Sequence, residues 1–267
     1  MSTHITTETI KELRDATGIS VMQCKRALEE AEGDMNKALA ILKKTSSDIA
    51  MKKMDREVKD GRVTIKTEEK GGMKHAVMVA LLCETDFVSR NDDFVHVHEG
   101  IAQMALEGGI DNMKTKAKEM IDGIIQKTGE NIVLGDTYEV TGTTMGSYVH
   151  NNKSGVIVSL HGGTPELAKD IAMHIVAMKP EFMTEQDIKD EEKKTMAEIF
   201  QKEVASVDKP EDIKKKMLEG KMRTYFAEKT LTSQVFIKNE PADGDQTVGK
   251  LLEKNGAKIV DVRRCLI

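Results

Sequence analysis

One stretch of the chain combines residues that could bind a metal ion. His96, His98 and Glu99 stand close together, and imidazole and carboxylate groups are common zinc ligands. Residues two apart share a side of a strand but face different ways on a helix. Residues 94–106 carry apolar side chains at helical spacing, so we expect a helix on which both histidines face solvent and cannot share an ion.

Other reactive side chains are isolated in the sequence. Cys83 has no neighbouring Lys, Arg or His that would lower its pKa. His174 lies within an apolar helical pattern, which is typical of a hydrogen-bonded core histidine rather than a base. Phosphate-binding glycine motifs, the G-x-S-x-G nucleophile motif and H-E-x-x-H are absent. We therefore expect no enzyme, no catalytic residues, no cofactor and no resident metal.

The stretch CETDFVSRNDDF, residues 83–94, is unusual because an aromatic residue follows a polar turn. Phe87 stands there although the chain has only 6 Phe, 3 Tyr and no Trp. In one interpretation, Phe87 folds back onto the core and Asp86 caps the next turn. In the other, the end of a rigid strand presents Asp86 and Phe87 together, a pair suited to insertion into another protein. These residues alone leave both interpretations open.

Composition limits the class of protein. The 267 residues carry a net charge of −5, and basic residues are interleaved with acidic ones, which is typical of solvated helix faces rather than of a nucleic-acid interface. The 3 cysteines are far apart and predict reduced thiols rather than disulfides. Neither a signal peptide nor an apolar run of about 18 residues is visible. We expect a soluble, cytoplasmic protein that binds neither nucleic acid nor a membrane directly.

Helical signals dominate the first part of the chain. Residues 1–45 predict a module of three short helices, with Ser20 and Asp34 as N-caps and glycines as stops. Such a small module has little core of its own, so exposed apolar residues near Met22 suit a docking surface. Residues 46–60 are charged and contain no Gly or Pro, and they predict a connecting helix or linker.

The remainder predicts an α+β fold. In residues 61–183, two hairpins are each followed by helices, which indicates a core of two similar α+β halves. Residues 184–230 show apolar side chains at helical spacing on both sides of Pro210, which predicts a projecting antiparallel helical hairpin. Residues 231–267 predict a return to the core with one short helix and one strand.

Several segments together resemble the bacterial elongation factor Ts family, the guanine-nucleotide exchange factors of elongation factor Tu. The similar segments run through nearly the whole chain and read KELRDATGISVMQCKRALEEAEGD, TDFVSRNDDF, KTGENI, GSYVH, IAMHIVAMKPEF, EGKM and LTSQVF. Each is weak alone, whereas their order is specific.

The resemblance implies a partner and a set of contact residues. It implies an N-terminal module similar to ubiquitin-associated domains that docks on the GTPase domain of elongation factor Tu, GDP-bound or nucleotide-free. Asp86 and Phe87 would insert near the magnesium and phosphate site and release GDP so that GTP binds. The other contact positions that it implies are Arg14, Val21, Met22, Thr85, Val88, Thr128, Gly129 and His150.

Some positions depart from the family pattern. The family has Met where Val21 stands and usually has Pro where Val235 stands. Family members typically continue beyond the segment DVRRCLI, so we expect a shortened C-terminal module. Two other functions remain open: a ubiquitin-type adaptor that binds through Met22 and Leu42 without affecting nucleotide release, and an enzyme that uses His96, His98 or Cys83.

Overall fold

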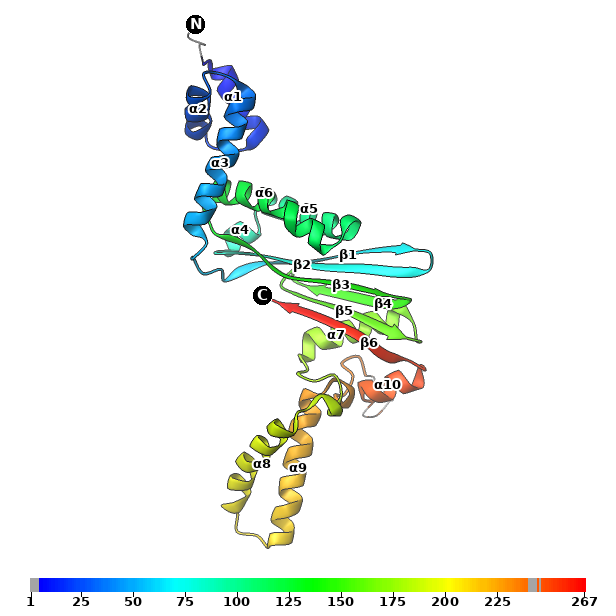
Figure 1. Ribbon diagram of the computed structural model, residues 1–267. Helices are drawn as coiled ribbons and strands as arrows, with labels where there is room; N and C mark the ends of the chain where they lie inside the picture. Colours follow the sequence, from blue (N-terminus) through cyan, green and yellow to red (C-terminus); the bar gives the residue numbers. More distant parts are fainter. Residues whose placement is uncertain (1–4, 240–243, 245) are drawn as a thin grey trace. The chain divides into compact units, whose positions relative to one another are not determined.

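The computed structural model describes residues 5–239, 244 and 246–267 and shows an α+β chain of helices and two small sheets (Figure 1). The chain divides into two compact units. The first contains the residues up to Thr141 together with Val149–Gly155 and Arg264–Ile267, and the second contains Gly142–Tyr148 and Val156–Arg263. The expected α+β class is confirmed.

Three helices form the N-terminal module, as the sequence predicts: α1 (Thr7–Thr17), α2 (Val21–Glu30) and α3 (Met35–Lys53). The side chain of Ser20 accepts a hydrogen bond from the N–H of Gln23, and that of Asp34 caps α3. Because these caps satisfy N–H groups that the first helical turn leaves free, the helices begin where the sequence indicates. Helix α3 continues beyond residue 45 to Lys53, through the first part of the segment predicted as a connecting helix or linker, because residues 46–53 contain no Gly or Pro to stop it.

The first sheet has the strand order β1-β2-β3, with β1 (Asp60–Lys70), β2 (Met73–Cys83) and β3 (Ile132–Gly142). The predicted hairpin is confirmed: β1 and β2 pair antiparallel around Gly71 and Gly72, whose φ angles of 61° and 78° suit glycine. Helices α4 (Asp86–Ser89), α5 (Asp92–Gly108) and α6 (Ile110–Thr128) follow β2. Alternate residues of β2 pack with α5 and α6 in one apolar core. We did not predict β3, in which Gly135, Asp136 and Thr137 interrupt the apolar residues.

The second sheet has the order β4-β5-β6, with β4 (Thr144–His150), β5 (Ser154–His161) and β6 (Lys258–Leu266). Helices α7 (Pro165–Met178) and α10 (Val248–Lys254) contribute to its apolar core. In both sheets a later strand lies next to the second strand of a hairpin. The two sheets share this order, and the duplication of the core stays a prediction.

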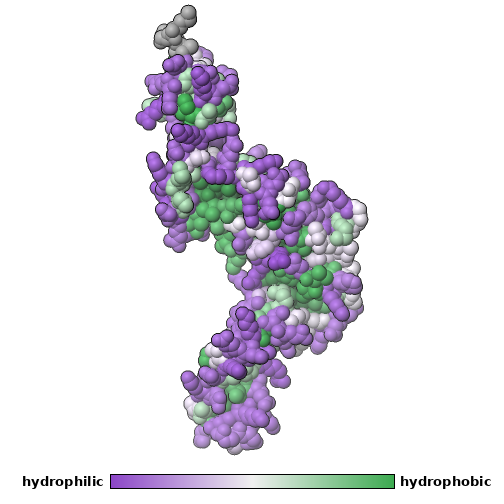
Figure 2. All heavy atoms as spheres, in the orientation of Figure 1, coloured by the Kyte–Doolittle hydropathy of each residue, from purple (hydrophilic) through white to green (hydrophobic). Residues whose placement is uncertain are grey.

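A 3-10 turn, Glu185–Asp187, precedes the helices α8 (Asp190–Ala205) and α9 (Glu211–Lys229), which pack on each other as the predicted antiparallel hairpin. The rings of Phe200 and Tyr225 meet edge to face between them, with centroids 5.6 Å apart. Figure 2 shows that the surface of this hairpin is mainly hydrophilic on the face drawn. A second 3-10 turn, Leu231–Ser233, follows α9. Within the described part of the chain, no helix is both long and apolar enough to span a bilayer.

Candidate functional site

A sharp turn after β2 leads into the one-turn helix α4. Val88 and Ser89 face the core and are buried there. Successive residues of a helix are rotated by about 100°, so Phe87 points away from that core, and its side chain is 83% exposed. Asp86 beside it is half-exposed and pairs with Arg90 at 3.1 Å between Oδ2 and Nη2. The interpretation in which Phe87 folds back onto the core is therefore wrong.

Two carboxylates connect this turn with the loop between α6 and β3. Glu130 accepts hydrogen bonds from the backbone N–H of Thr85 at 3.0 Å and from its hydroxyl at 2.6 Å. In the opposite direction, Glu84 accepts a hydrogen bond from the backbone N–H of Asn131 at 2.6 Å. This bond from Asn131 is the main reason why the pKa of Glu84 is lowered. The backbone that carries Phe87 is thus held from both sides by an arrangement that we call the carboxylate clamp, formed by Glu84 and Glu130.

The loop after α6 is itself attached to the end of α3. Thr128 is the last residue of α6, and Gly129 ends the helix in the left-handed conformation with a φ of 77°. The ammonium of Lys53 donates a hydrogen bond to the carbonyl of Gly129. The Asn131 side chain donates another to the carbonyl of Arg56 at 2.7 Å. The predicted contact residues Thr128 and Gly129 therefore lie where α6 meets the loop that the carboxylate clamp connects to Phe87.

A third loop, between β4 and β5, begins directly after the exposed His150, the last residue of β4, and we call it the loop of His150. Asn151 and Asn152 follow His150 with φ angles of 49° and 57°, a conformation that Asn adopts more readily than most residues. Lys153 then reaches back to Asp60 at the start of β1, with Nζ and Oδ1 2.6 Å apart. Burial alone would raise the pKa of Asp60, but hydrogen bonds, led by the one from Lys153, lower it. This ion pair fixes the loop of His150 to the first sheet.

The turn after β2, the loop after α6 and the loop after β4 lie close together in the first unit. A pocket beside α4 is lined by residues of that helix and by residues of the loop of His150. The structure therefore places Thr85, Asp86, Phe87, Thr128 and Gly129 together, with the loop of His150 next to α4. Val88 differs from the prediction, because its side chain is only 9% exposed and packs in the core. It anchors the turn from inside rather than presenting a contact surface.

The predicted docking residues of the N-terminal module form a separate surface. Val21 and Met22, at the start of α2, are 49% and 59% exposed, and Arg14 on α1 is also exposed. Apolar residues of this size that remain outside a core suit contact with another protein. Leu42, by contrast, is buried in the core of the module. An adaptor surface that includes Leu42 is therefore wrong.

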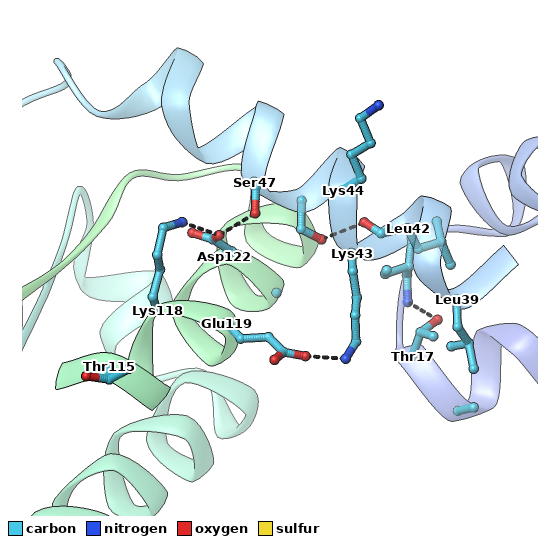
Figure 3. A pocket seen from close by; sticks show the side chains of 14 residues that line it. Thr17, Leu39, Leu42, Lys43, Lys44, Ser47, Thr115, Lys118, Glu119 and Asp122 are labelled. Atoms are coloured by element: carbon cyan, nitrogen blue, oxygen red, sulfur yellow. Dashed lines mark hydrogen bonds and ion pairs between the residues drawn. The ribbon is translucent and has the colours of Figure 1, made fainter. Parts of the chain in front are cut away.

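Polar contacts join α3 to α6 (Figure 3). The hydroxyl of Ser47 donates to Asp122 at 2.7 Å, and Lys118 donates to the same Oδ2 at 2.6 Å. Lys43 pairs with Glu119 across a pocket of about 690 Å³. Because the Lys43–Glu119 pair is exposed, it contributes at most about 1 kcal/mol to holding the helices together.

Comparisons with known proteins agree with this arrangement. The model of the family described as Elongation factor TS matches residues 84–267. The chain is 38% identical over 265 residues to Elongation factor Ts of Hahella chejuensis, covering 97% of this chain and 91% of that protein. It is 38% identical over 267 residues to Elongation factor Ts of Thioalkalivibrio sulfidiphilus, covering 96% and 89%. For Elongation factor Ts of Aeromonas salmonicida the identity is 37% over 271 residues, covering 98% and 90%. The chain belongs to the elongation factor Ts family.

The three loops lie within the part of the chain that matches the elongation factor Ts family model. The matched region begins at Glu84, the first carboxylate of the clamp. The clamp residues Glu84 and Glu130 and the anchoring residue Asp60 were not predicted as part of the site. Glu84 directly precedes the TDF segment and Glu130 is the middle residue of the GEN segment, and this position was the only signal that could have found them. Nothing in the sequence pairs Asp60 with Lys153.

The two histidines of the candidate metal site differ in burial in this member of the elongation factor Ts family. His96 is exposed, but the expectation for His98 is wrong: it is buried, and its Nε2 donates to the carbonyl of Val79 at 2.9 Å. Burial is the main cause that lowers the pKa of His98. Among the residues that the structure describes, no group of three or more His, Cys, Asp and Glu could hold a metal ion.

Cys83 and His174 are likewise internal groups. Burial, together with the nearby charges of Asp60 and Glu130, raises the pKa of the Cys83 thiol to about 12, so it is not an activated nucleophile. His174 is the hydrogen-bonded core histidine that the sequence predicts: its Nδ1 accepts from the N–H of Ile237 at 3.1 Å.

Proposed function

We propose that this protein is the guanine-nucleotide exchange factor of elongation factor Tu in translation elongation. We further propose that it releases GDP by inserting Asp86 and Phe87 near the magnesium and phosphate site of that partner. The observation that carries this proposal is the exposure of Phe87, whose side chain is 83% exposed on a turn that the carboxylate clamp holds in place. An apolar ring held out on a rigid turn can fill a pocket of another protein without a large ordering cost.

The physical basis of release is linkage between two binding events. A G protein holds GDP partly through Mg²⁺ and partly through the backbone around the phosphates. A ring inserted between elements of that site, with the carboxylate of Asp86 near the metal, weakens both kinds of contact. If the factor lowers the affinity for nucleotide, nucleotide lowers the affinity for the factor by the same ratio. GTP binding therefore completes the exchange by displacing the factor.

The other exposed residues are proposed to dock the partner. Arg14, Val21 and Met22 would bind the GTPase domain through the N-terminal module, and Thr128, Gly129 and His150 would contact the same domain beside Phe87. This chain makes and breaks no covalent bond in such a process, so it is not proposed as an enzyme. It is proposed to act in the cytoplasm, on GDP-bound and nucleotide-free elongation factor Tu, without binding nucleic acid directly.

Stopped-flow release of fluorescent GDP from elongation factor Tu tests the proposal. The wild-type chain should accelerate release, and Phe87→Ala should reduce that acceleration by roughly 30-fold, since truncation of a central interface anchor costs about 2 kcal/mol. Met73→Ala is a matched control, because Met73 is also an exposed apolar side chain but lies at the hairpin turn.

Two results would contradict the proposal in different ways. If the wild-type chain leaves the rate of GDP release unchanged, the exchange function is wrong. If it accelerates release but Phe87→Ala and Asp86→Ala behave like Met73→Ala, exchange stands and the insertion mechanism is wrong. Circular dichroism of each variant is the check that its fold is retained.

A further inference from the structure

A cationic pocket lies beside the exposed turn, and none of the predicted contact residues lines it. Its volume is about 340 Å³, and its walls come from β1, from α4 and from the loop of His150. The lining side chains share the ability to donate hydrogen bonds and include no acid: Arg62, Ser89, Arg90, Asn151, Asn152 and Lys153. Such a set of donors suits an oxyanion.

Charge pairing leaves one of these cations uncompensated. Arg90 pairs with Asp86 at 3.1 Å, and Lys153 pairs with Asp60 at 2.6 Å. Arg62 forms no ion pair with the residues that the structure describes, and its Nε is buried without a hydrogen-bond partner among them. A buried donor of a guanidinium that lacks an acceptor costs free energy. A carboxylate that pairs with this guanidinium from the pocket would supply the negative charge that no ion pair provides.

We propose that this pocket binds an acidic side chain of the protein partner, with Arg62 as the main donor. The proposal rests on the proposed function, because the occupant would come from the same partner that receives Phe87. A carboxylate can accept two parallel hydrogen bonds from a guanidinium. The other hydrogen-bond donors of the pocket would surround this carboxylate, and its negative charge would balance the positive charge of Arg62.

The position of the pocket favours a protein side chain over a free anion. Arg90, on one wall, follows Phe87 by three residues, so both lie within one helical turn. The pocket is therefore continuous with the surface that Phe87 presents to the partner. A partner that receives the ring brings its own surface residues to the mouth of the pocket. An Asp or Glu among them would enter the pocket as part of the same binding event, whereas a free anion would have to bind separately.

Binding of nucleotide-free elongation factor Tu to Arg62→Gln, measured by surface plasmon resonance at several salt concentrations, tests the pocket. We expect the dissociation constant to rise by roughly ten-fold or more, with a weaker salt dependence than for the wild-type chain. Lys116→Gln, which removes one exposed charge from α6, should change it by less than about two-fold. Arg62→Lys should give an intermediate loss, because it keeps the charge without the planar guanidinium.

Thermal unfolding distinguishes a binding role of Arg62 from a structural one, because removal of a structural residue would lower the melting temperature of the free protein. Because Arg62 has an unsatisfied donor, Arg62→Gln should not lower the melting temperature of the free protein. A second arm measures the melting temperature with inorganic phosphate. Protection of the wild-type chain but not of Arg62→Gln, with partner binding unchanged, would assign the pocket to free phosphate and overturn the proposal.

The experiments distinguish an error in the pocket proposal from an error in the proposed function. If Phe87→Ala impairs exchange while Arg62→Gln binds the partner as tightly as Lys116→Gln does, the pocket proposal is wrong and the exchange function stands. If the wild-type chain neither binds elongation factor Tu nor accelerates GDP release, the proposed function and this occupant are both wrong.

Discussion

Removal of the Glu130 carboxylate should uncouple the Phe87 turn from the loop after α6. Glu130 accepts two hydrogen bonds from Thr85, at 3.0 Å from the backbone N–H and at 2.6 Å from the hydroxyl. A hydrogen bond to a charged group contributes about 1.5–3 kcal/mol. The carboxylate is only partly buried, so solvent replaces part of these two bonds and we expect Glu130→Ala to remove about 1.5–2 kcal/mol in total from the clamped conformation.

The loss of clamp free energy in Glu130→Ala should slow the release of GDP that the factor catalyses. Each 1.4 kcal/mol corresponds to about a factor of ten in population, and the apparent affinity of a partner falls with the fraction of molecules in the competent conformation. We therefore expect Glu130→Ala to slow the catalysed release of GDP by about 10- to 30-fold at subsaturating factor. The exposed Glu69 on β1 offers a control, and Glu69→Ala should leave the rate within about two-fold.

A double-mutant cycle with Phe87→Ala decides whether Glu130 acts through the ring. If Glu130 only positions Phe87, its removal should have little further effect once the ring is absent, so the two losses will not add. Stopped-flow release is measured for the wild-type chain, both single variants and the double variant, with urea unfolding of each as a check on stability. Fully additive losses, or a Glu130→Ala rate equal to that of Glu69→Ala, would refute the positioning role.

Two further predictions concern buried titratable groups. Because the pKa of Cys83 is raised to about 12, iodoacetamide at pH 8 should modify it far more slowly in the native protein than in urea; equal rates by mass spectrometry would contradict this. Burial lowers the pKa of both His98 and His174, so their contribution to stability is present above the unfolded-state pKa of about 6.5 and is lost as the pH falls below it. The free energy of unfolding should fall between pH 7 and pH 5, by up to about 1.4 kcal/mol per pH unit and histidine, and His174→Gln should flatten that slope; an unchanged slope would show that His174 does not contribute.

Local signals were sufficient for most of the secondary structure. The N-caps Ser20 and Asp34 and the Gly71–Gly72 turn act over a few residues, and the helices and the hairpin formed where these signals predict them. Strand β3 was missed because Gly135, Asp136 and Thr137 interrupt its apolar residues, so no continuous alternation marks it, and its place beside β2 is decided by pairing. Residues 46–60 were left open as a connecting helix or a linker, because a charged segment without Gly or Pro suits both, and the structure shows that α3 continues to Lys53.

The sequence by itself determined the motifs, the helix boundaries near their caps, and the presence of an aromatic residue after a polar turn. Only the tertiary structure decided that Phe87 faces solvent, that Val88 and His98 face the core, and that the three loops meet. The reason is the separation of the partners along the chain. Thr85 and Glu130 are 45 residues apart, and Asp60 and Lys153 are 93 apart. No local pattern encodes such contacts, which exist only once the sheet and its helices have packed.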